Sequence, residues 1–276
     1  MSAPDIRDLA IIGDRRTAAL VSRDGSVVWY CPGRFDRPAL LTALLDPERG
    51  GSWTISSIGP GAVPVRRRYL GESGVLETTL EAPTGEWSVT DFMPLGDGLP
   101  RGLCRRFSPA PNESVVTLRA APDYGRRGAD PRVAGGGVTV DGTRTLYASH
   151  PLELSGETVR FTLPADETGW AFLTDEPLAA PPDAEAVAGW LAGTLAAWQE
   201  RAARTTYRGP YELEVAASLR ALRLLSFEEN GGVVGAATTG LPEVVGGGPE
   251  LRLPLRLAPR RRDDCERPHP GGRRPP

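Results

Sequence analysis

The stretch TAALVSRDGSVVWYC, residues 17–31, decides the fold because it consists of two apolar segments around a tight turn. Thr17–Ser22 and Ser26–Cys31 are the apolar segments, and Arg23-Asp24-Gly25 separates them. The Asp-Gly pair supplies the positive φ angle that a tight hairpin turn requires. The stretch therefore predicts two antiparallel strands joined by a short turn.

Short apolar segments of the same kind recur through about the first 180 residues, and Asp141-Gly142 marks a further turn. A second hairpin has strands at Val75–Glu81 and Trp87–Met93, with Pro83-Thr84-Gly85 between them. The other predicted strands are Leu9–Ile12, Val115–Ala120, Val138–Val140, Thr145–Ala148, Val159–Leu163 and Trp170–Thr174. Strands at this spacing without intervening helices indicate an antiparallel sandwich. We therefore expect a mainly β protein in which residues 1–180 form a β-sandwich domain.

Composition and charge narrow the class of protein. The 276 residues include 33 glycines and 27 prolines, which favours many turns over a helix bundle. Hydrophobic residues make up 40% and charged residues 24%, values that exclude a disordered chain. The net charge of -3 and the absence of a basic stretch before the C-terminal end argue against a nucleic acid partner. No run of eighteen apolar residues and no signal-peptide core occur, so we expect a cytoplasmic protein without a membrane partner.

Two helices are predicted after the sandwich. Pro181-Pro182-Asp183 is a helix-start signal, and apolar residues then recur at three- and four-residue steps. These residues are Val187, Leu191, Leu195, Trp198 and Ala202. We assign residues 181–206 to a linker helix. A second apolar stripe follows between Tyr211 and Phe227, with Val215, Leu219, Leu222 and Leu225 along it.

The sequence changes character after Gly248. Residues 249–276 contain eight arginines and seven prolines and no apolar period that would pack a helix. We expect this tail to be disordered.

The inventory of reactive side chains offers no obvious site. Cys31, Cys104 and Cys265 lie far apart and show neither disulfide nor CxxC metal spacing. The two histidines, His150 and His269, are too few for a metal cluster. Neither a zinc enzyme nor a Ser-His-Asp hydrolase is therefore expected, and we predict no metal and no cofactor.

Three further features have both a structural and a functional interpretation. The glycine-rich stretch Gly231–Gly248 matches no phosphate-binding motif, so we interpret it as a structural loop. Arg34-Phe35-Asp36 could bind a polyol, and an internal salt bridge that closes a loop is the favoured alternative. The tryptophans could stack on sugars, although we favour a role in the cores; they are Trp29, Trp53, Trp87, Trp170, Trp190 and Trp198.

Several strings together resemble one enzyme family. Ile12-Gly13-Asp14-Arg15-Arg16-Thr17 leads into Asp24-Gly25-Ser26-Val27-Val28-Trp29, and Arg34-Phe35-Asp36-Arg37-Pro38 follows. Further matching strings are Leu44–Gly51, Arg68–Leu70, Val75–Thr78, Val89–Pro94, Tyr207–Tyr211 and Ala236–Glu243. In order along the chain, they resemble the N-terminal domain of bacterial glycoside hydrolase family 15, the glucoamylase and trehalase-like enzymes. Val28 is a departure, because the family usually has an acidic residue before the tryptophan.

The resemblance implies a β-sandwich followed by an (α/α)₆ barrel that holds the active site. It implies an inverting hydrolase of α-glucosidic bonds, in which two glutamates act as general acid and general base about 6.5–9.5 Å apart. In the family, the loop after Leu-Pro-Glu leads into a string close to RNWDYRYCWLRDA, which this sequence lacks. We therefore assign no catalytic, cofactor-binding or metal-binding residue, and assign residues 207–248 to the first helix and loop of a truncated barrel.

The tail has a simple genetic explanation. Codons that encode residues 249–263 can be chosen so that the same DNA, read one base later, encodes RNCDYRYAWLRDAA, close to the missing string. We therefore interpret residues 249–276 as an out-of-frame translation.

Three functional expectations follow from these assignments. In the first, the chain is an inactive N-terminal fragment of a family 15 hydrolase whose intact form acts on trehalose or another α-glucoside. In the second, it is a non-catalytic carbohydrate-binding or interaction module. In the third, the fragment has no function and exposes its second helix. Whether the chain is itself an enzyme, and its oligomeric state, stay open at this point.

Overall fold

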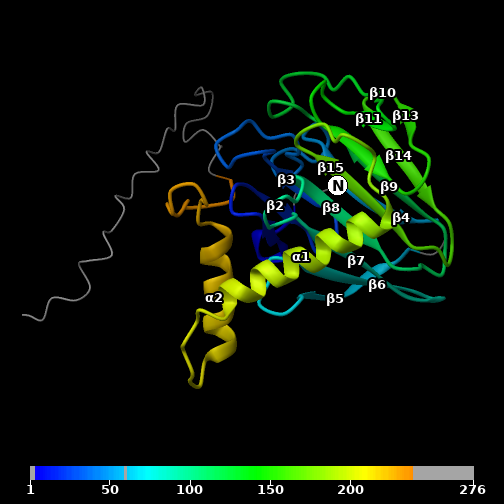
Figure 1. Cartoon of the computed structure of the whole chain (residues 1–276). Coiled ribbons are helices and arrows are strands. Elements are labelled where there is room, and N and C mark those ends of the chain that lie inside the picture. Colours follow the sequence, from blue (N-terminus) through cyan, green and yellow to red (C-terminus); the bar gives the residue numbers. More distant parts are fainter. Residues whose placement is uncertain (1–3, 59–60, 239–276) are drawn as a thin grey trace, which may run out of the picture.

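The computed structural model describes residues 4–58 and 61–238, in which two antiparallel β-sheets pack face to face and two α-helices lie against them (Figure 1). The first sheet, in spatial order, consists of β1 (Ala10–Gly13), β2 (Ala18–Val21), β3 (Val27–Tyr30), β4 (Ser52–Ser57), β9 (Ser114–Arg119), β14 (Thr158–Leu163) and β13 (Glu153–Ser155). The second consists of β10 (Arg132–Ala134), β11 (Gly137–Thr139), β12 (Thr145–Ala148), β15 (Gly169–Thr174), β8 (Gly102–Phe107), β7 (Gly85–Phe92), β6 (Leu76–Ala82) and β5 (Val63–Tyr69). The expected antiparallel β-sandwich is confirmed.

The main core lies between the two sheets and follows from the two-residue period of the strands. In β9, Ser114, Val116 and Leu118 are buried while the residues between them are partly exposed. The β2–β3 hairpin forms as predicted, and Gly25 in its turn has a φ of 81°. The alternation of apolar residues therefore places one face of each sheet in the core.

Five strands were not predicted, namely β4, β5, β8, β10 and β13. Their sequences lack clear apolar alternation: β5 contains Pro64 and three arginines, and β8 contains Arg105 and Arg106. β5 is an edge strand, where proline and exposed charges are tolerated. β8 is instead an interior strand of its sheet, and its charge at Arg105 is satisfied inside the protein.

Helix α1 (Ala184–Ala202) covers the outer face of the second sheet, which it crosses in Figure 1. The Asp183 carboxylate caps the helix by accepting a hydrogen bond from the Ala186 N–H at 2.7 Å, as the helix-start signal predicts. Val187 and Trp198 are buried, and Trp190 packs on Phe172 with 4.8 Å between the ring centroids. The predicted linker helix therefore packs through its apolar stripe.

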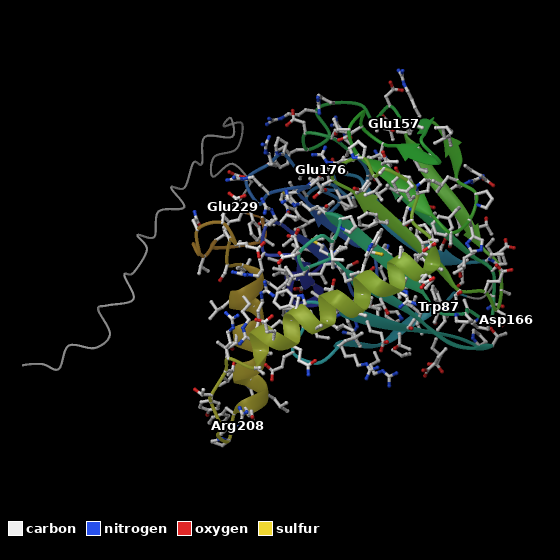
Figure 2. All side chains as sticks on the ribbon, viewed as in Figure 1. Trp87, Glu157, Asp166, Glu176, Arg208 and Glu229 are labelled. Carbon is white, nitrogen blue, oxygen red and sulfur yellow. The ribbon has the colours of Figure 1, made fainter. Side chains whose placement is uncertain are left out.

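Helix α2 (Glu212–Leu224) contacts the sandwich at its C-terminal end. Leu224 is its buried residue and packs with Trp198 and Leu95, whereas Tyr211 and Leu222 of the predicted stripe are exposed. Figure 2 shows Arg208 in the connection between α1 and α2, and this residue lines a cavity together with the turn that follows β5. No helix within the described ranges is long and apolar enough to cross a bilayer. Residues 239–248 of the predicted loop and the predicted out-of-frame tail, 249–276, lie outside the described residues.

Gly74 allows both helices to approach the turn between β5 and β6. A Cβ atom added at this position would lie 2.8 Å from Leu224 Cδ2 and 2.9 Å from the Trp198 ring. Contacts this short require the backbone or the two side chains to move.

We predict that Gly74→Ala lowers the free energy of unfolding by about 1–3 kcal/mol, because the added methyl group overpacks the site where α1 and α2 meet. Urea unfolding followed by circular dichroism measures the change. Gly189→Ala is the matched control, since a Cβ at this exposed position of α1 meets no atom within 4 Å. Equal stability of Gly74→Ala and the wild type would show that the helices are not held at this contact.

Candidate functional site

The turn between β1 and β2 is held by a buried carboxylate. Asp14 Oδ1 accepts hydrogen bonds from the backbone N–H groups of Arg16 and Thr17, each at 2.9 Å. Asp14 is 4% exposed, and Arg15 has a φ of 69°, in the left-handed region. These bonds compensate an unfavourable backbone conformation, so the turn presents Arg15 and Arg16 in fixed positions.

The segment that follows α2 docks on this turn. The Glu228 N–H donates a hydrogen bond to the Arg15 carbonyl oxygen at 2.8 Å. Arg16 Nη2 and Arg34 Nη1 lie 2.6 and 3.5 Å from the two oxygens of Glu229, which Figure 2 places next to the sandwich. One strand-like bridge, between Ser226 and Val233, closes the segment into a loop.

Apolar contacts outweigh the ion pairs in this docking. Phe227 is 2% exposed and meets Phe35 edge to face, with 6.5 Å between the ring centroids. Burying such a side chain contributes about 1.5–3 kcal/mol, whereas partly exposed ion pairs such as those of Glu229 contribute about 0–1 kcal/mol each. The ion pairs therefore mainly fix the position of the segment after α2, and the burial of Phe227 mainly stabilises its docking.

A tryptophan completes the contact. Trp29 Nε1 donates a buried hydrogen bond of 3.1 Å to the Ala237 carbonyl oxygen. Ala237 belongs to the string Ala236–Glu243, of which residues 239–243 lie outside the described residues. Three strings that are far apart in the sequence, near Asp14, Arg34 and Ala237, therefore meet on one docking face.

Arg34-Phe35-Asp36 forms the favoured internal salt bridge. Arg34 Nε and Nη2 donate to the two oxygens of Asp36 at 2.9 and 3.2 Å. The Arg34 guanidinium also lies 4.9 Å from the centroid of the Phe227 ring. Because these contacts engage the charged groups within the chain, the motif serves the docking face.

Buried acidic groups lie behind the docking face. Burial raises the pKa of Asp14 to about 6, and the nearby Asp175 adds to the rise. Burial also raises the pKa of Asp175, although the Tyr30 hydroxyl, 2.7 Å from Asp175 Oδ1, opposes this rise as a hydrogen-bond donor. The Arg144 guanidinium likewise lowers the pKa of Asp175.

A polar cavity of about 250 Å³ opens beside Asp14. Arg16, Arg101, Arg201 and Glu228 contribute to its wall. Glu228 lies 3.7 Å from both Arg15 and Arg201, and Asp14 is bound by its own turn. Since these carboxylates are already engaged, the arrangement suits docking of a chain segment better than acid/base chemistry.

The remaining sequence candidates have structural roles. Cys31 and Cys104 are free and buried, and burial raises the pKa of the Cys31 thiol to about 12 and that of Cys104 as well. His150 lies between Ser149 and Glu167, with its Nε2 atom 3.1 Å from Glu167 Oε2. Cys265 and His269 lie outside the described residues. Within the described part of the chain, no three His, Cys, Asp or Glu side chains come together as a metal site would require.

The tryptophans fill cores, as the favoured interpretation predicted. Trp29, Trp53 and Trp198 are fully buried, Trp87 and Trp170 nearly so, and Trp190 is half-buried against Phe172. Five of the six side chains are therefore buried, and the sixth, Trp190, packs against Phe172.

Sequence reasoning did not find the docking face. Asp14 with Thr17 three residues later is a spacing typical of side-chain-stabilised turns, and this signal was available. The pairing of Arg16 and Arg34 with Glu229 has no local signal, because about 200 residues separate the partners.

The fold and docking face define a β-sandwich domain that holds the start of a helical segment. A family model described as trehalase-like, N-terminal, matches residues 1–173, more than half of the chain. The chain belongs to this family.

Three curated trehalases show the extent of the similarity. The trehalase of Thermoplasma volcanium is 27% identical over 260 residues, which cover 88% of this chain and 41% of that protein. The trehalase of Thermoplasma acidophilum is 26% identical over 244 residues, covering 83% and 41%. The trehalase of Mycolicibacterium smegmatis is 39% identical over 93 residues, covering 34% and 14%. The chain therefore spans less than half the length of these relatives.

We predict that Asp14 makes stability depend on pH. Because the pKa of Asp14 is raised to about 6, the folded chain binds a proton between about pH 4 and pH 6 that the unfolded chain has lost. The free energy of unfolding that Asp14 contributes is therefore largest below about pH 4. It decreases between about pH 4 and pH 6 and stays at its lower value above pH 6. Asp14→Asn keeps an oxygen acceptor for the turn but has no charge to bury.

The stability of Asp14→Asn relative to the wild type should therefore rise by about 2 kcal/mol between pH 4 and pH 7, as urea unfolding at several pH values would measure. Asp97→Asn, an exposed carboxylate of the same cavity, controls for the loss of a negative charge. A pH-independent difference between Asp14→Asn and the wild type would contradict this assignment.

Proposed function

We propose that this chain forms the N-terminal part of an inverting glycoside hydrolase that acts on α-glucosidic bonds, with trehalose as the favoured substrate. The colinear similarity to the Thermoplasma trehalases across most of the chain carries this proposal. The sandwich occupies residues 1–180, the linker helix residues 181–206, and residues 207–248 begin an (α/α)₆ barrel. The enzyme is cytoplasmic and uses no cofactor.

Exposed apolar side chains on α2 support its assignment to a barrel. Leu213 is 84% exposed and Leu222 52%, and their spacing places them on opposite sides of the helix. Tyr211, the N-cap residue, is 66% exposed. A surface of this kind is typical of a helix that packs against further helices. The docking face then holds the segment after α2 in place at the start of the barrel.

Catalysis by inversion needs two carboxyl groups on opposite sides of the scissile bond, with room for a water molecule between them. We propose that these groups belong to the barrel and that the 276-residue chain alone does not hydrolyse sugars. The sandwich would then stabilise the enzyme and position the barrel, and the barrel would contribute the catalytic groups.

We predict that the purified chain, shown to be folded by circular dichroism, releases no glucose from trehalose or maltose in an enzyme-coupled glucose assay. Positioned acid/base groups and electrostatic stabilisation supply most of the rate of such enzymes, and the chain lacks the sugar-binding string that accompanies them. Steady turnover of either disaccharide would overturn the proposal that the chain is inactive.

A chimera tests whether this chain can serve as the N-terminal part of a trehalase. Residues 1–237 of this chain would replace the matching part of the Thermoplasma volcanium trehalase, so that the docking face is kept whole. Trehalose hydrolysis by the folded chimera is the expected result. A folded chimera that does not hydrolyse trehalose would contradict the proposal.

A further inference from the structure

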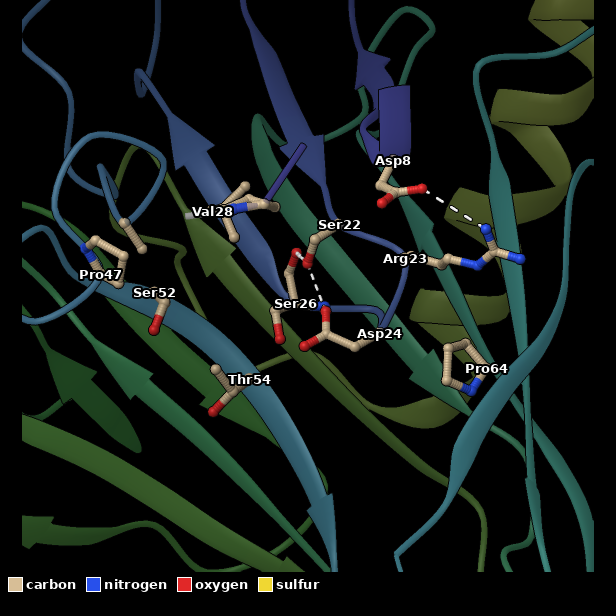
Figure 3. Close-up of a pocket in the computed structure, with 12 residues that line it drawn as sticks. Asp8, Ser22, Arg23, Asp24, Ser26, Val28, Pro47, Ser52, Thr54 and Pro64 are labelled. Carbon is tan, nitrogen blue, oxygen red and sulfur yellow. Dashed lines mark hydrogen bonds and ion pairs between the residues drawn. The ribbon is translucent and has the colours of Figure 1, made fainter. Parts of the chain in front are cut away.

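A cavity of about 250 Å³ lies on the outer side of the first sheet (Figure 3). Strand β4 turns Trp53 into the core, so Ser52 and Thr54 point to the opposite side and line the cavity. The β2–β3 turn contributes Ser22, Asp24 and Ser26 to its wall. The cavity is therefore built on rigid strands and a fixed turn.

The cavity wall is mostly apolar, and the few polar groups in it have free hydrogen-bonding capacity. Within the described residues, the hydroxyl groups of Ser26 and Ser52 have no side-chain hydrogen bond, and Thr54 Oγ1 has only a long contact of 3.5 Å with the Thr117 carbonyl oxygen. Asp24 Oδ1 accepts from the Ser26 N–H at 3.0 Å. Hydroxyl groups both donate and accept hydrogen bonds, and the second oxygen of Asp24 adds an acceptor.

The floor of the cavity is apolar and uncharged. Val28 is 6% exposed and Ala43 7%, and Pro47 and Pro64 stand at the rim. Val28 therefore leaves an apolar surface at the base of the cavity.

We propose that this cavity binds a neutral polyol the size of one pyranose ring. The ring carbons would contact Val28 and the prolines, and the hydroxyl groups would bond to Ser26, Ser52, Thr54 and Asp24. The volume lies below the range of about 300–1,000 Å³ typical for drug-sized ligands, so a single ring fits better than a disaccharide.

The charges at the rim disfavour an anionic ligand. Asp8 and Asp24 contribute two carboxylates and Arg23 one guanidinium, which lies 3.6 Å from Asp8. Because the Arg23 guanidinium is paired with Asp8, the cavity wall offers a phosphate or carboxylate ligand no free positive charge, and a neutral polyol needs none. This site requires no barrel and is independent of the proposed hydrolase function.

Titration with D-glucose, followed by saturation-transfer NMR on the full chain, tests the proposal. We expect saturable binding with a millimolar dissociation constant, because so small a ligand makes few contacts. Thr54→Val removes one hydroxyl at nearly constant volume and should weaken binding about tenfold.

Thr117→Val is the matched control. Thr117 lies directly opposite Thr54 on β9, on the same face of the sheet, but outside the cavity wall. It should leave the dissociation constant unchanged. Ala43→Leu, which fills the cavity, should abolish binding and provides a second test if Thr54→Val does not fold.

Three results would overturn the proposal. The first is the absence of saturable glucose binding up to about 100 mM, well above the expected dissociation constant. The second is equal binding by wild type, Thr54→Val and Ala43→Leu, which would place the sugar elsewhere. The third is tighter binding of isobutanol than of glucose, which would define an apolar site.

Discussion

One buried guanidinium links the two sheets of this sandwich. Arg105 on β8 is completely buried, and its Nε atom lies 2.8 Å from Asp91 Oδ1 on the neighbouring strand β7. Across the core, it donates to the Trp53 carbonyl oxygen at 2.8 Å and to the Gly25 carbonyl oxygen. Because a buried charge without partners costs several kcal/mol, each of these acceptors must be in place when the sheets close. The hydrogen bonds from Arg105 to the Trp53 and Gly25 carbonyl oxygens therefore join one sheet to the other, while the ion pair with Asp91 holds the guanidinium in place.

The way the two sheets pack determines the positions of the helices and of the segment that follows them. Arg105 points inward, so its neighbour Cys104 points to the outer face of the second sheet, where α1 covers it together with Phe172 and Val187. The position of α1 brings Trp198 to Gly74, and Leu224 of α2 joins them there. The segment after α2 then returns to the turn at Asp14. The sandwich thus determines the position of the segment that we propose to be the start of a barrel.

Local patterns were enough to predict the sandwich class, the β2–β3 hairpin and α1, because apolar period and turn residues decide these elements. They failed at β8, since a strand that buries an arginine lacks the apolar alternation of ordinary strands. They predicted the helix α2 but not its buried contact, because Leu224, which lies outside the predicted stripe, is the buried residue, while Tyr211 is exposed. The pairs Arg105–Asp91 and Arg16–Glu229 are set by tertiary packing, so no local signal reveals them.

A double-mutant cycle at Asp91 and Arg105 tests most directly whether the ion pair supports the buried guanidinium that bonds to the other sheet. Asp91→Leu and Arg105→Met should each lower the free energy of unfolding by about 3–5 kcal/mol, because each leaves buried polar groups without partners. The double variant should lose clearly less than the sum, with a coupling of about 2–3 kcal/mol, since no unpaired charge then remains. Single losses that add within about 0.5 kcal/mol would contradict the role assigned to the pair.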